Sequence, residues 1–406
     1  MQWSSRAMLR LLIVNILDRE EKIMAEWLKT ALIDIVELIG GGTPKTSKAE
    51  YWGGNINWLS VKDFNNENRY VYSTEKTITE EGLNNSSTKL LKKDDIIISA
   101  RGTVGELAMI PFPMAFNQSC YGIRAKEGID SIFLYYLIKN SVRKLKAITH
   151  GSVFDTITRD TFANIEVAIS DIKTQHRIAK MLADIDDKVE NNQRINNNLE
   201  QQAQAIYQQM FIDNARSDWA EGTLSDIADI TIGQSPSGSS YNEDGTGTIF
   251  FQGRAEFGFR FPSVRLYTTE PKRMARSNDT LMSVRAPVGD LNVAHTDCCI
   301  GRGLAAIHSK SNHQSFVLYT MFSLKKQLDV FNGEGTVFGS INRNSLNDMP
   351  ILIPSDDILD EFERIVAPMD LTIRNNYDEI CRLQDIRDTL LPRLMSGELD
   401  VSDIDI

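Results

Sequence analysis

Residues 98–107, ISARGTVGEL, return in altered form as MSVRAPVGDL at residues 282–291. Ser99 aligns with Ser283, and an arginine, a valine and a glycine align at the same constant shift in residue number, which we call the repeat shift. Solenoid repeats have periods of ~20–50 residues, so a shift this long indicates a duplicated domain. The chain of 406 residues is therefore expected to contain one fold twice.

The similarity extends well beyond this phrase. DIVELIGGGTP at 34–44 matches DIADITIGQSP at 226–236, and GSVFDTITRDTFANIEVAI at 151–169 matches GTVFGSINRNSLNDMPILI at 335–353. One repeat then covers about residues 32–213 and the other about 222–397. Both repeats are long enough to bury a core of their own.

The composition is that of a soluble globular protein, with 42% hydrophobic and 24% charged residues. The cysteines (Cys120, Cys298, Cys299 and Cys381) form no C-x-x-C pair, and the five histidines show no ligand spacing. These features indicate a reducing compartment, which we take to be cytoplasmic, and no structural metal site.

The first residues differ from the rest of the chain. LRLLIVNIL at 9–17 is apolar but too short to span a bilayer, and no small-residue cleavage site follows it. From Met24 onward the sequence is that of an ordinary domain. We interpret residues 1–23 as an N-terminal extension outside the fold, and leave open whether they are translated.

Each repeat has a strand-rich first part and a helical second part. The first part is punctuated by Gly and Pro and contains one apolar stretch typical of a helix, at 131–148 and 314–331. The second part, at 171–213 and 355–397, repeats apolar residues every seven positions on two seams over four heptads. Both copies keep one register, which favours a coiled coil over a simple buried helix, the alternative interpretation. The seam positions are Ile178, Ile185, Asn192, Leu199 and Ile206 with Leu182, Val189, Asn196, Ala203 and Met210, and, at the repeat shift, Phe362, Met369, Asn376, Leu383 and Leu390 with Val366, Ile373, Ile380, Arg387 and Leu394.

Three asparagines occupy seam positions where Leu or Ile would be more stable: Asn192, Asn196 and Asn376. If the helices pair antiparallel about the repeat axis, Asn196 faces Asn376 and Asn192 lies one layer away. Buried asparagines that bond each other fix the register at a cost in stability, so Asn376→Leu is expected to raise stability and loosen the register. The alternative is that the helices splay here and water solvates the amides.

The net charge of −11 is concentrated near the C-terminus, where residues 355–406 hold 5 basic and 14 acidic residues. The strand-rich parts carry basic clusters, at 139–146 and 272–276. In GRAEFGFRFPSVRLY at 253–267, arginines alternate with aromatic residues. This combination suits nucleic-acid binding, although a solvated charged surface explains any single cluster equally well.

The sequence lacks the usual catalytic motifs. GGGTPKTS at 40–47 has no glycine before its lysine, as a phosphate loop requires, and its counterpart TIGQSPSG at 231–238 has no lysine at all. There is no G-x-S-x-G or H-E-x-x-H motif, and no glycine-rich strand with the Asn/Asp-Pro-Pro-aromatic loop of an amino-methyltransferase. We therefore expect no catalytic residues and interpret the glycine-rich stretches as turns between strands.

This organisation resembles the DNA-specificity subunits of type I restriction–modification systems. The markers are the two helical segments, TQHRIAKMLADIDDKVENNQRINNNLEQQAQAIYQQMF at 174–211 and DEFERIVAPMDLTIRNNYDEICRLQDIRDTLLPRLMSGEL at 360–399, and the start GGGTPKTSKAEYWGGNINWLSVKDF at 40–64. The resemblance covers nearly everything after Met24, and the helical segments are its most specific part. Residues 1–23 have no counterpart in it.

The resemblance implies an α+β fold with two strand-rich target recognition domains in tandem repeat, separated by two long helices that form an antiparallel coiled coil. Each recognition domain would read one half of a split site on double-stranded DNA. The implied division is an extension at 1–23, a first recognition domain at 24–170, a first helix at 171–213, a second recognition domain at 214–354, a second helix at 355–397 and an acidic tail at 398–406.

The resemblance also implies partners. The helices would dock two methyltransferase (modification) subunits, and restriction (translocating nuclease) subunits could join that core. S-adenosylmethionine, ATP and Mg would be bound by those partners, and no cofactor by this chain. The chemistry at adenine would belong to the modification subunits, which flip the base out of the duplex.

Candidate DNA contacts come first from the repeated phrase. One interpretation is a strand, a tight turn that needs Gly105 and Gly289, and another strand. The other is a phosphate clamp shared by both repeats, formed by Arg101 and Arg285 with Gly102 and Thr103 beside the first arginine. Because the phrase occurs in both repeats, it is not expected to choose between DNA sequences.

Candidate base readers lie elsewhere. Lys62 and Asp63 follow a predicted strand in the first repeat, and Gln252 and Arg254 lie near the equivalent place in the second. A role as ordinary surface residues is the alternative for each. The recognised DNA sequence cannot be derived from these residues.

Two other classes of function remain open: a methyltransferase with degenerate motifs, and a stand-alone DNA-binding regulator or coiled-coil scaffold. Methyl transfer to DNA by the purified chain alone would favour the first class. Co-purification from the source cell, with no catalytic partner found, would favour the second.

Overall fold

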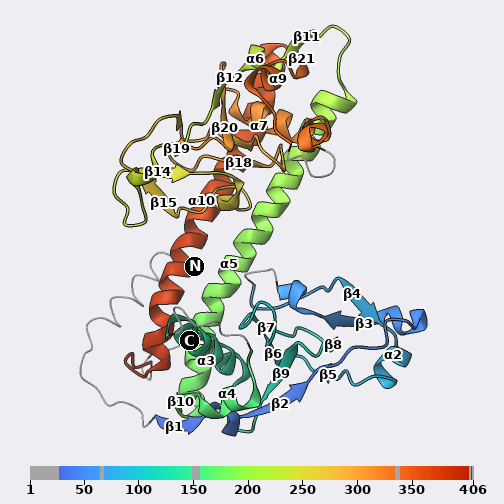
Figure 1. The fold of residues 1–406 in the computed structure, drawn as a ribbon, viewed down its shortest axis with the longest axis vertical. Coiled ribbons are helices and arrows are strands. Elements are labelled where there is room, and N and C mark those ends of the chain that lie inside the picture. The colour runs from blue at the N-terminus through green and yellow to red at the C-terminus, as the bar shows by residue number, and fades with distance from the viewer. Residues whose placement is uncertain (1–26, 65–67, 149–155, 334–338, 402–403, 405–406) are drawn as a thin grey trace, which may run out of the picture. The chain divides into compact units, whose positions relative to one another are not determined.

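The structure, a computed structural model, describes residues 27–64, 68–148, 156–333, 339–401 and 404. The extension that we assign to residues 1–23 lies outside them. The chain forms two compact units, the first made of residues up to 191 together with those from 379 onward, and the second of residues 192–378. Each unit contains one strand-rich domain and about half of each long helix (Figure 1).

The first strand-rich domain is built on two sheets. Its strands are β2 (Val36–Gly40), β3 (Trp52–Leu59), β4 (Lys76–Ile78), β5 (Leu90–Leu91), β6 (Ile96–Ser99), β7 (Leu107–Met109), β8 (Met114–Phe116) and β9 (Cys120–Ala125). One sheet has the order β2-β9-β6-β7 and is antiparallel, and the other has the order β4-β3-β8-β5 with β3 and β8 parallel. Side chains alternate along β6, so Ile96 and Ile98 enter the core shared with the helices while Ile97 enters the core between the sheets.

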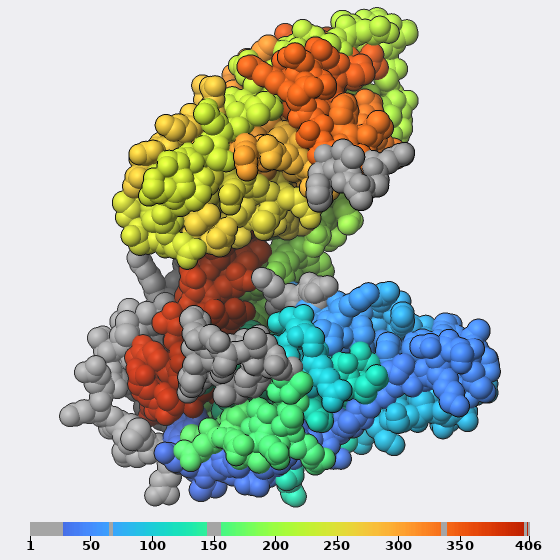
Figure 2. Space-filling model, in the orientation of Figure 1, coloured from blue at the N-terminus to red at the C-terminus, as the bar shows by residue number. Residues whose placement is uncertain are grey.

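The second strand-rich domain repeats this topology. Its strands are β12 (Ala228–Ile232), β13 (Tyr241–Asn242), β14 (Thr248–Phe251), β15 (Leu266–Thr268), β16 (Met274–Ala275), β17 (Thr280–Ser283), β18 (Leu291–Val293), β19 (Cys298–Ile300) and β20 (Leu304–Ser309). The sheet orders are β12-β20-β17-β18 and β13-β15-β14-β19-β16, and β14 and β19 are again parallel. Strand β13 is the addition relative to the first domain. Figure 2 shows the yellow and orange part of this domain packed as one continuous body.

A two-stranded antiparallel ribbon joins the two ends of each domain. In the first unit β1 (Leu28–Ala31) pairs with β10 (Glu166–Ile169), and in the second β11 (Ala220–Thr223) pairs with β21 (Pro350–Ile353). The chain therefore enters and leaves each domain along two neighbouring strands that are paired with each other.

Shorter helices complete the domains. They are α2 (Glu80–Asn84), α3 (Ser131–Ile148) and α4 (Arg159–Asn164), then α6 (Leu224–Ile227), α7 (Gln314–Ser323), α8 (Lys325–Leu328) and α9 (Arg343–Asn347), with 3-10 turns η1 (Leu32–Asp34), η2 (Ala49–Tyr51), η3 (Val61–Phe64), η5 (Gly238–Ser240), η6 (Arg254–Glu256) and η7 (Asp329–Asn332). The helix predicted at 131–148 is confirmed as α3. The one predicted at 314–331 is divided into α7, α8 and η7, with Leu324 between α7 and α8.

The two long helices are α5 (Ile172–Tyr207), extended by the π-helical turn η4 (Gln208–Asp213), and α10 (Asp356–Met395). They confirm the helices predicted at 171–213 and 355–397. The Asp171 carboxylate caps α5 by accepting from the backbone N–H groups of Lys173 and Thr174, and Gly397, at φ 75°, follows the end of α10. The predicted acidic tail is not wholly solvated, because Leu399 and Val401 are buried.

Within each unit α5 and α10 pair antiparallel. In the first unit Arg387 bonds Asp186, while Glu379 lies 3.3 Å from Lys188. In the second unit the ring of Tyr207 contacts that of Phe362. The predicted seam is confirmed, because its apolar members are buried or half-buried in the cores of the two units.

Candidate DNA interface

The repeated phrase forms a hairpin turn that a serine closes from inside. The backbone N–H of Ser99 donates to the Glu106 carbonyl, and its hydroxyl donates to the Thr103 carbonyl (2.5 Å) while accepting from the Glu106 N–H (2.8 Å). Gly105 donates to the Ser99 carbonyl with φ at 84°, a conformation that glycine adopts without strain.

The second repeat reproduces this turn bond for bond. The Ser283 hydroxyl donates to the Pro287 carbonyl (2.6 Å) and accepts from the Asp290 N–H (2.9 Å). Gly289 donates to the Ser283 carbonyl with φ at 82°. Serine and glycine therefore account for the structural part of the phrase in both units.

The arginines of the phrase take no part in the turn. Arg101 and Arg285 are both exposed, and within the described part of the chain neither guanidinium has a hydrogen-bond or ion-pair partner. Gly102, at φ 82°, and Thr103 are exposed at the tip. The structure thus separates the two interpretations of the phrase: its fold rests on serine and glycine, while its arginines stay available for a ligand.

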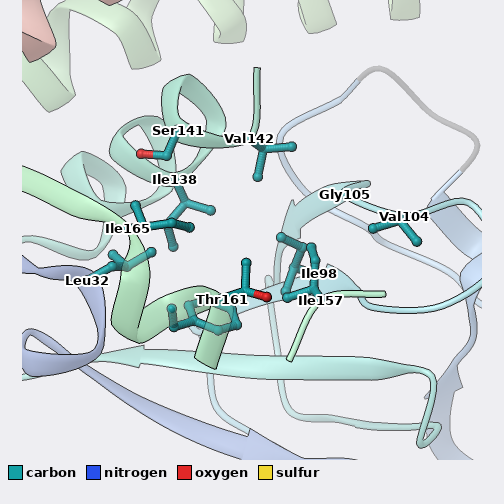
Figure 3. Close-up of a pocket in the computed structure, with 11 residues that line it drawn as sticks. Leu32, Ile98, Val104, Gly105, Ile138, Ser141, Val142, Ile157, Thr161 and Ile165 are labelled. Atoms are coloured by element: carbon teal, nitrogen blue, oxygen red, sulfur yellow. The ribbon is translucent and has the colours of Figure 1, made fainter. Parts of the chain in front are cut away.

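A small cavity lies beneath the first turn (Figure 3). Its lining comes from the turn itself, through Val104 and Gly105, and from Ile98, Ile138 and Leu32 among others, and its volume is about 20 Å³. That volume holds about one water molecule, far less than a cofactor needs. The turn is therefore seated on the core of the first unit, with its tip pointing outward.

Lys62 and Asp63 lie on η3, and the structure gives them different surroundings. Asp63 accepts hydrogen bonds from the Ser60 N–H and hydroxyl and from the Glu75 N–H, so both its oxygens hold the local backbone. Lys62 is 80% exposed, with Glu75 3.9 Å away. A base contact by Lys62 stays a prediction, and the geometry argues against one by Asp63.

The arginines of the aromatic-rich loop also differ from one another. Arg254, on η6, is exposed but forms a short ion pair with Asp290, so DNA contact would have to compete with that carboxylate. Arg260, which the sequence groups with it, is only 4% exposed and pairs with Glu200 and Asp370. That part of the sequence-based interpretation is wrong, because Arg260 faces the helices rather than solvent.

The basic cluster on α3 is likewise only partly a surface feature. Lys139 is half-buried near Asp186 and Arg387, and burial lowers its pKa. Arg143 donates to the backbone carbonyl of Asp388 on α10. The side chains of Lys144 and Lys146 lie outside the described residues. In the second domain Lys272, Arg273 and Arg276 are exposed, although Arg276 lies 3.2 Å from the His308 ring.

The predicted contact between seam asparagines is confirmed. Asn376 donates to the Oδ1 atom of Asn196 (2.8 Å), and Asn196 donates to the Ile373 carbonyl (3.4 Å). Asn196 and Asn192 are buried, and Asn376 is half-buried. Their role in fixing the register stays a prediction.

The described residues show neither a metal-binding cluster nor a membrane-spanning helix. No group of three or more His, Cys, Asp or Glu side chains there is placed to hold a metal ion. None of the helices described there is long and apolar enough to cross a bilayer.

Comparisons with known proteins bear on this arrangement. Residues 24–201 match the family described as "Type I restriction modification DNA specificity domain". The MjaIX type I restriction enzyme specificity subunit of Methanocaldococcus jannaschii is 28% identical, over 94% of this chain and 96% of its own length. The EcoR124I/EcoR124II specificity subunit of Escherichia coli is 32% identical over 40% of this chain and 41% of its own. A solved structure of a type I restriction-modification S subunit from M. genitalium, 17% identical, covers 92% of this chain and 97% of its own with a TM-score of 0.61, which indicates a shared fold.

Two strand-rich domains of one topology, each packed on antiparallel helices, are the fold that the sequence resemblance implies, and residues 24–201 match the family of specificity domains. The resemblance found in the sequence is confirmed: the chain is a relative of the type I restriction enzyme specificity subunits, and it matches one of them along nearly all of its length.

Proposed function

We propose that this chain is the specificity subunit of a type I restriction–modification complex and reads a bipartite site on double-stranded DNA. The observation that carries the proposal is the duplication of one topology with different side chains in each copy. Two copies of one fold in a chain can bind a split site as a homodimer binds a palindrome, and different surfaces give different half-sites.

The division of labour within the interface follows from the repeated turn. Arg101 and Arg285 are exposed on turns of the same geometry, so a phosphate contact by both would position each domain without reading sequence. Residues that differ between the domains, such as Lys62 and Arg254, would then be placed for base contacts.

Catalysis is assigned to partners. Two methyltransferase subunits would dock on this chain, with restriction subunits as further partners, and they would bind S-adenosylmethionine, ATP and Mg. This chain would carry out no chemical step and would bring those subunits to the adenine that they modify. The absence of catalytic motifs from the sequence supports this assignment.

The experiment is methyl transfer with and without the modification subunits. We expect labelled methyl groups to appear on DNA only when both components are present, and only on DNA that carries the target. Methyl transfer by this chain alone would assign it catalysis instead. Specific DNA binding without any co-purifying modification subunit would favour a stand-alone regulator.

A further inference from the structure

Each strand-rich domain places one buried arginine against the helix pair of its own unit. Arg69 is 5% exposed and Arg260 is 4% exposed. The Arg69 carbonyl accepts from the Met109 N–H and the Arg260 carbonyl from the Val293 N–H, both at 2.8 Å. Met109 and Val293 are related by the repeat shift, so the two arginines occupy the same place in the repeated fold.

In the first unit the carboxylates that accept from this arginine lie on α5. Arg69 donates to Asp187 (2.5 Å), and its backbone N–H donates to Glu190 (2.7 Å). The neighbouring Asp186 accepts from the hydroxyl of Tyr136 (2.7 Å), which itself lies 3.2 Å from Arg69. The other oxygen of Asp186 accepts from Arg387 of α10 (2.8 Å). We call Asp186, Asp187, Glu190 and Arg387 the first seat.

In the second unit the equivalent arginine, Arg260, lies near carboxylates of both helices. The guanidinium of Arg260 lies 3.1 Å from Glu200 on α5 and 3.3 Å from Asp370 on α10. The Tyr319 hydroxyl lies 3.1 Å from Arg260 and donates to Asp370 (2.9 Å). We call Asp370, Arg374 and Glu200 the second seat, since Arg374 also holds this domain by donating to Asn278 and to the His295 carbonyl.

The repeat shift reveals what the seats share. Asp186 corresponds to Asp370, so one carboxylate is common to both. Asp187 corresponds to Leu371, which is 57% exposed, and Glu190 corresponds to Arg374. The second seat therefore has an apolar leucine where the first has the ion-pair partner Asp187, and an arginine where the first has the acceptor Glu190.

The second seat also has a carboxylate that the first lacks, and the first has an arginine that the second lacks. Glu200 corresponds to Gln384 in the first unit, and the position of Arg387 is taken in the second unit by Ala203, which is fully buried. Burial raises the pKa of both Glu190 and Glu200, while the hydrogen bond from the Arg69 N–H and the charge of Arg260 oppose that rise in Glu190 and Glu200 respectively. Arg69 and Arg260 are buried, although the Asp187 carboxylate is 59% exposed. Leaving a buried arginine without its carboxylate partners is destabilising, so a mismatched seat has a cost.

We propose that the two seats differ so that each recognition domain packs well only at its own position on the helix pair, and that a domain moved to the other position is mismatched there. Arg69 and Arg260 act as positioning residues in this scheme, and neither contacts DNA. The proposal rests on the proposed function only for its consequence, that the domain reading one half-site cannot be moved to the other position without a loss of stability. The docking itself is a property of the fold.

The test uses a chimera cut at the ribbons. A second copy of residues 28–169 replaces residues 220–353, so the Arg69 of that copy faces Leu371 and Arg374. The pair of substitutions Leu371→Asp and Arg374→Glu converts the second seat toward the first. We expect these substitutions to raise the melting temperature of the chimera by about 2–4 °C or more, and to lower that of the parent chain by a similar amount.

A rise in the melting temperature of the chimera together with a fall in that of the parent chain is the result expected if each seat matches its own domain. The proposal fails if the two substitutions shift both proteins in the same direction, or if the unsubstituted chimera melts at the parent's temperature. Melting needs neither DNA nor partners, so a protein that shows the reversal yet binds no specific DNA would refute only the proposed function.

If the chimera does not fold, a second measurement on the parent chain tests the proposal. In the parent chain Asp187→Leu should lower the melting temperature, and it should lower it by less than half as much when Arg69→Met is already present. Equal losses in both backgrounds would show that Asp187 and Arg69 act independently, and would overturn the proposal.

Discussion

Individual residues of the repeated phrase divide between those that hold the turn and those that project from it. Ser99 and Ser283 satisfy the backbone of the turns from inside, whereas Arg101 and Arg285 project from them. A serine that accepts from a main-chain N–H is costly to remove, while an exposed arginine without a partner contributes little to folding. The two kinds of residue are therefore expected to respond to mutation in opposite ways.

The first prediction concerns the arginines. Arg101→Ala or Arg285→Ala should weaken binding to all DNA sequences alike and flatten the salt dependence by about one unit, with an unchanged melting temperature. Binding titrations over a range of salt concentrations provide the measurement. Ser99→Ala is the matched control, and should cost about 1–3 kcal/mol of stability because it leaves the Glu106 N–H without its acceptor. Loss of a single base preference on Arg101→Ala would contradict the phosphate assignment.

The second prediction compares two glycines with the same φ of 82°. A Cβ atom at Gly289 would lie 2.9 Å from the Cβ atom of Leu328, whereas one at Gly102 would meet open space. Gly102→Ala should cost about 1–2 kcal/mol for the left-handed backbone, and Gly289→Ala about 1–3 kcal/mol more for the overlap. Urea unfolding measures both, and equal losses would show that Leu328 moves aside.

At the scale of elements, the long helices are the best-predicted part of the molecule. Their seams repeat every seven residues in both copies, and a pattern that long leaves little room for another structure. Interruption of the second apolar helix after Ser323 was not predictable, because residues 314–331 contain no Pro or Gly that would mark a break. Burial of Arg260 was missed because its partners, Glu200 and Asp370, are far away in sequence. Arg69 stands in no motif at all, and only the equivalence of the two folds identifies it.

The third prediction concerns the helix seam. The sequence led us to expect that Asn376→Leu raises the stability, whereas the structure leads us to expect that it lowers it. Asn376→Leu would leave the buried Oδ1 atom of Asn196 without a donor, which costs about 1–3 kcal/mol. The double variant Asn196→Leu/Asn376→Leu removes both amides and should be at least as stable as the parent, with a looser register. Urea unfolding of the two variants decides between these outcomes. A single variant more stable than the parent would mean that water reaches the amide of Asn196.

At the scale of the whole molecule, the sequence predicts the duplication, the class of fold and the class of function, because each is encoded in patterns tens of residues long. It does not predict which side chains meet DNA. Exposed residues such as Lys62 and Arg254 are not distinguished from ordinary surface residues by any local pattern. The ribbons β1–β10 and β11–β21 add what the sequence could not supply, a boundary at which a recognition domain can be replaced as a unit.

The central claim is that each recognition domain reads its own half of a split DNA site. Its most direct test replaces residues 28–169 with the corresponding domain of a relative of different specificity, expresses the protein with its modification subunits and maps the methylated sites. The account predicts that one half-site changes to the donor's sequence while the other half-site stays the same. A change in both half-sites, or in neither, would contradict it.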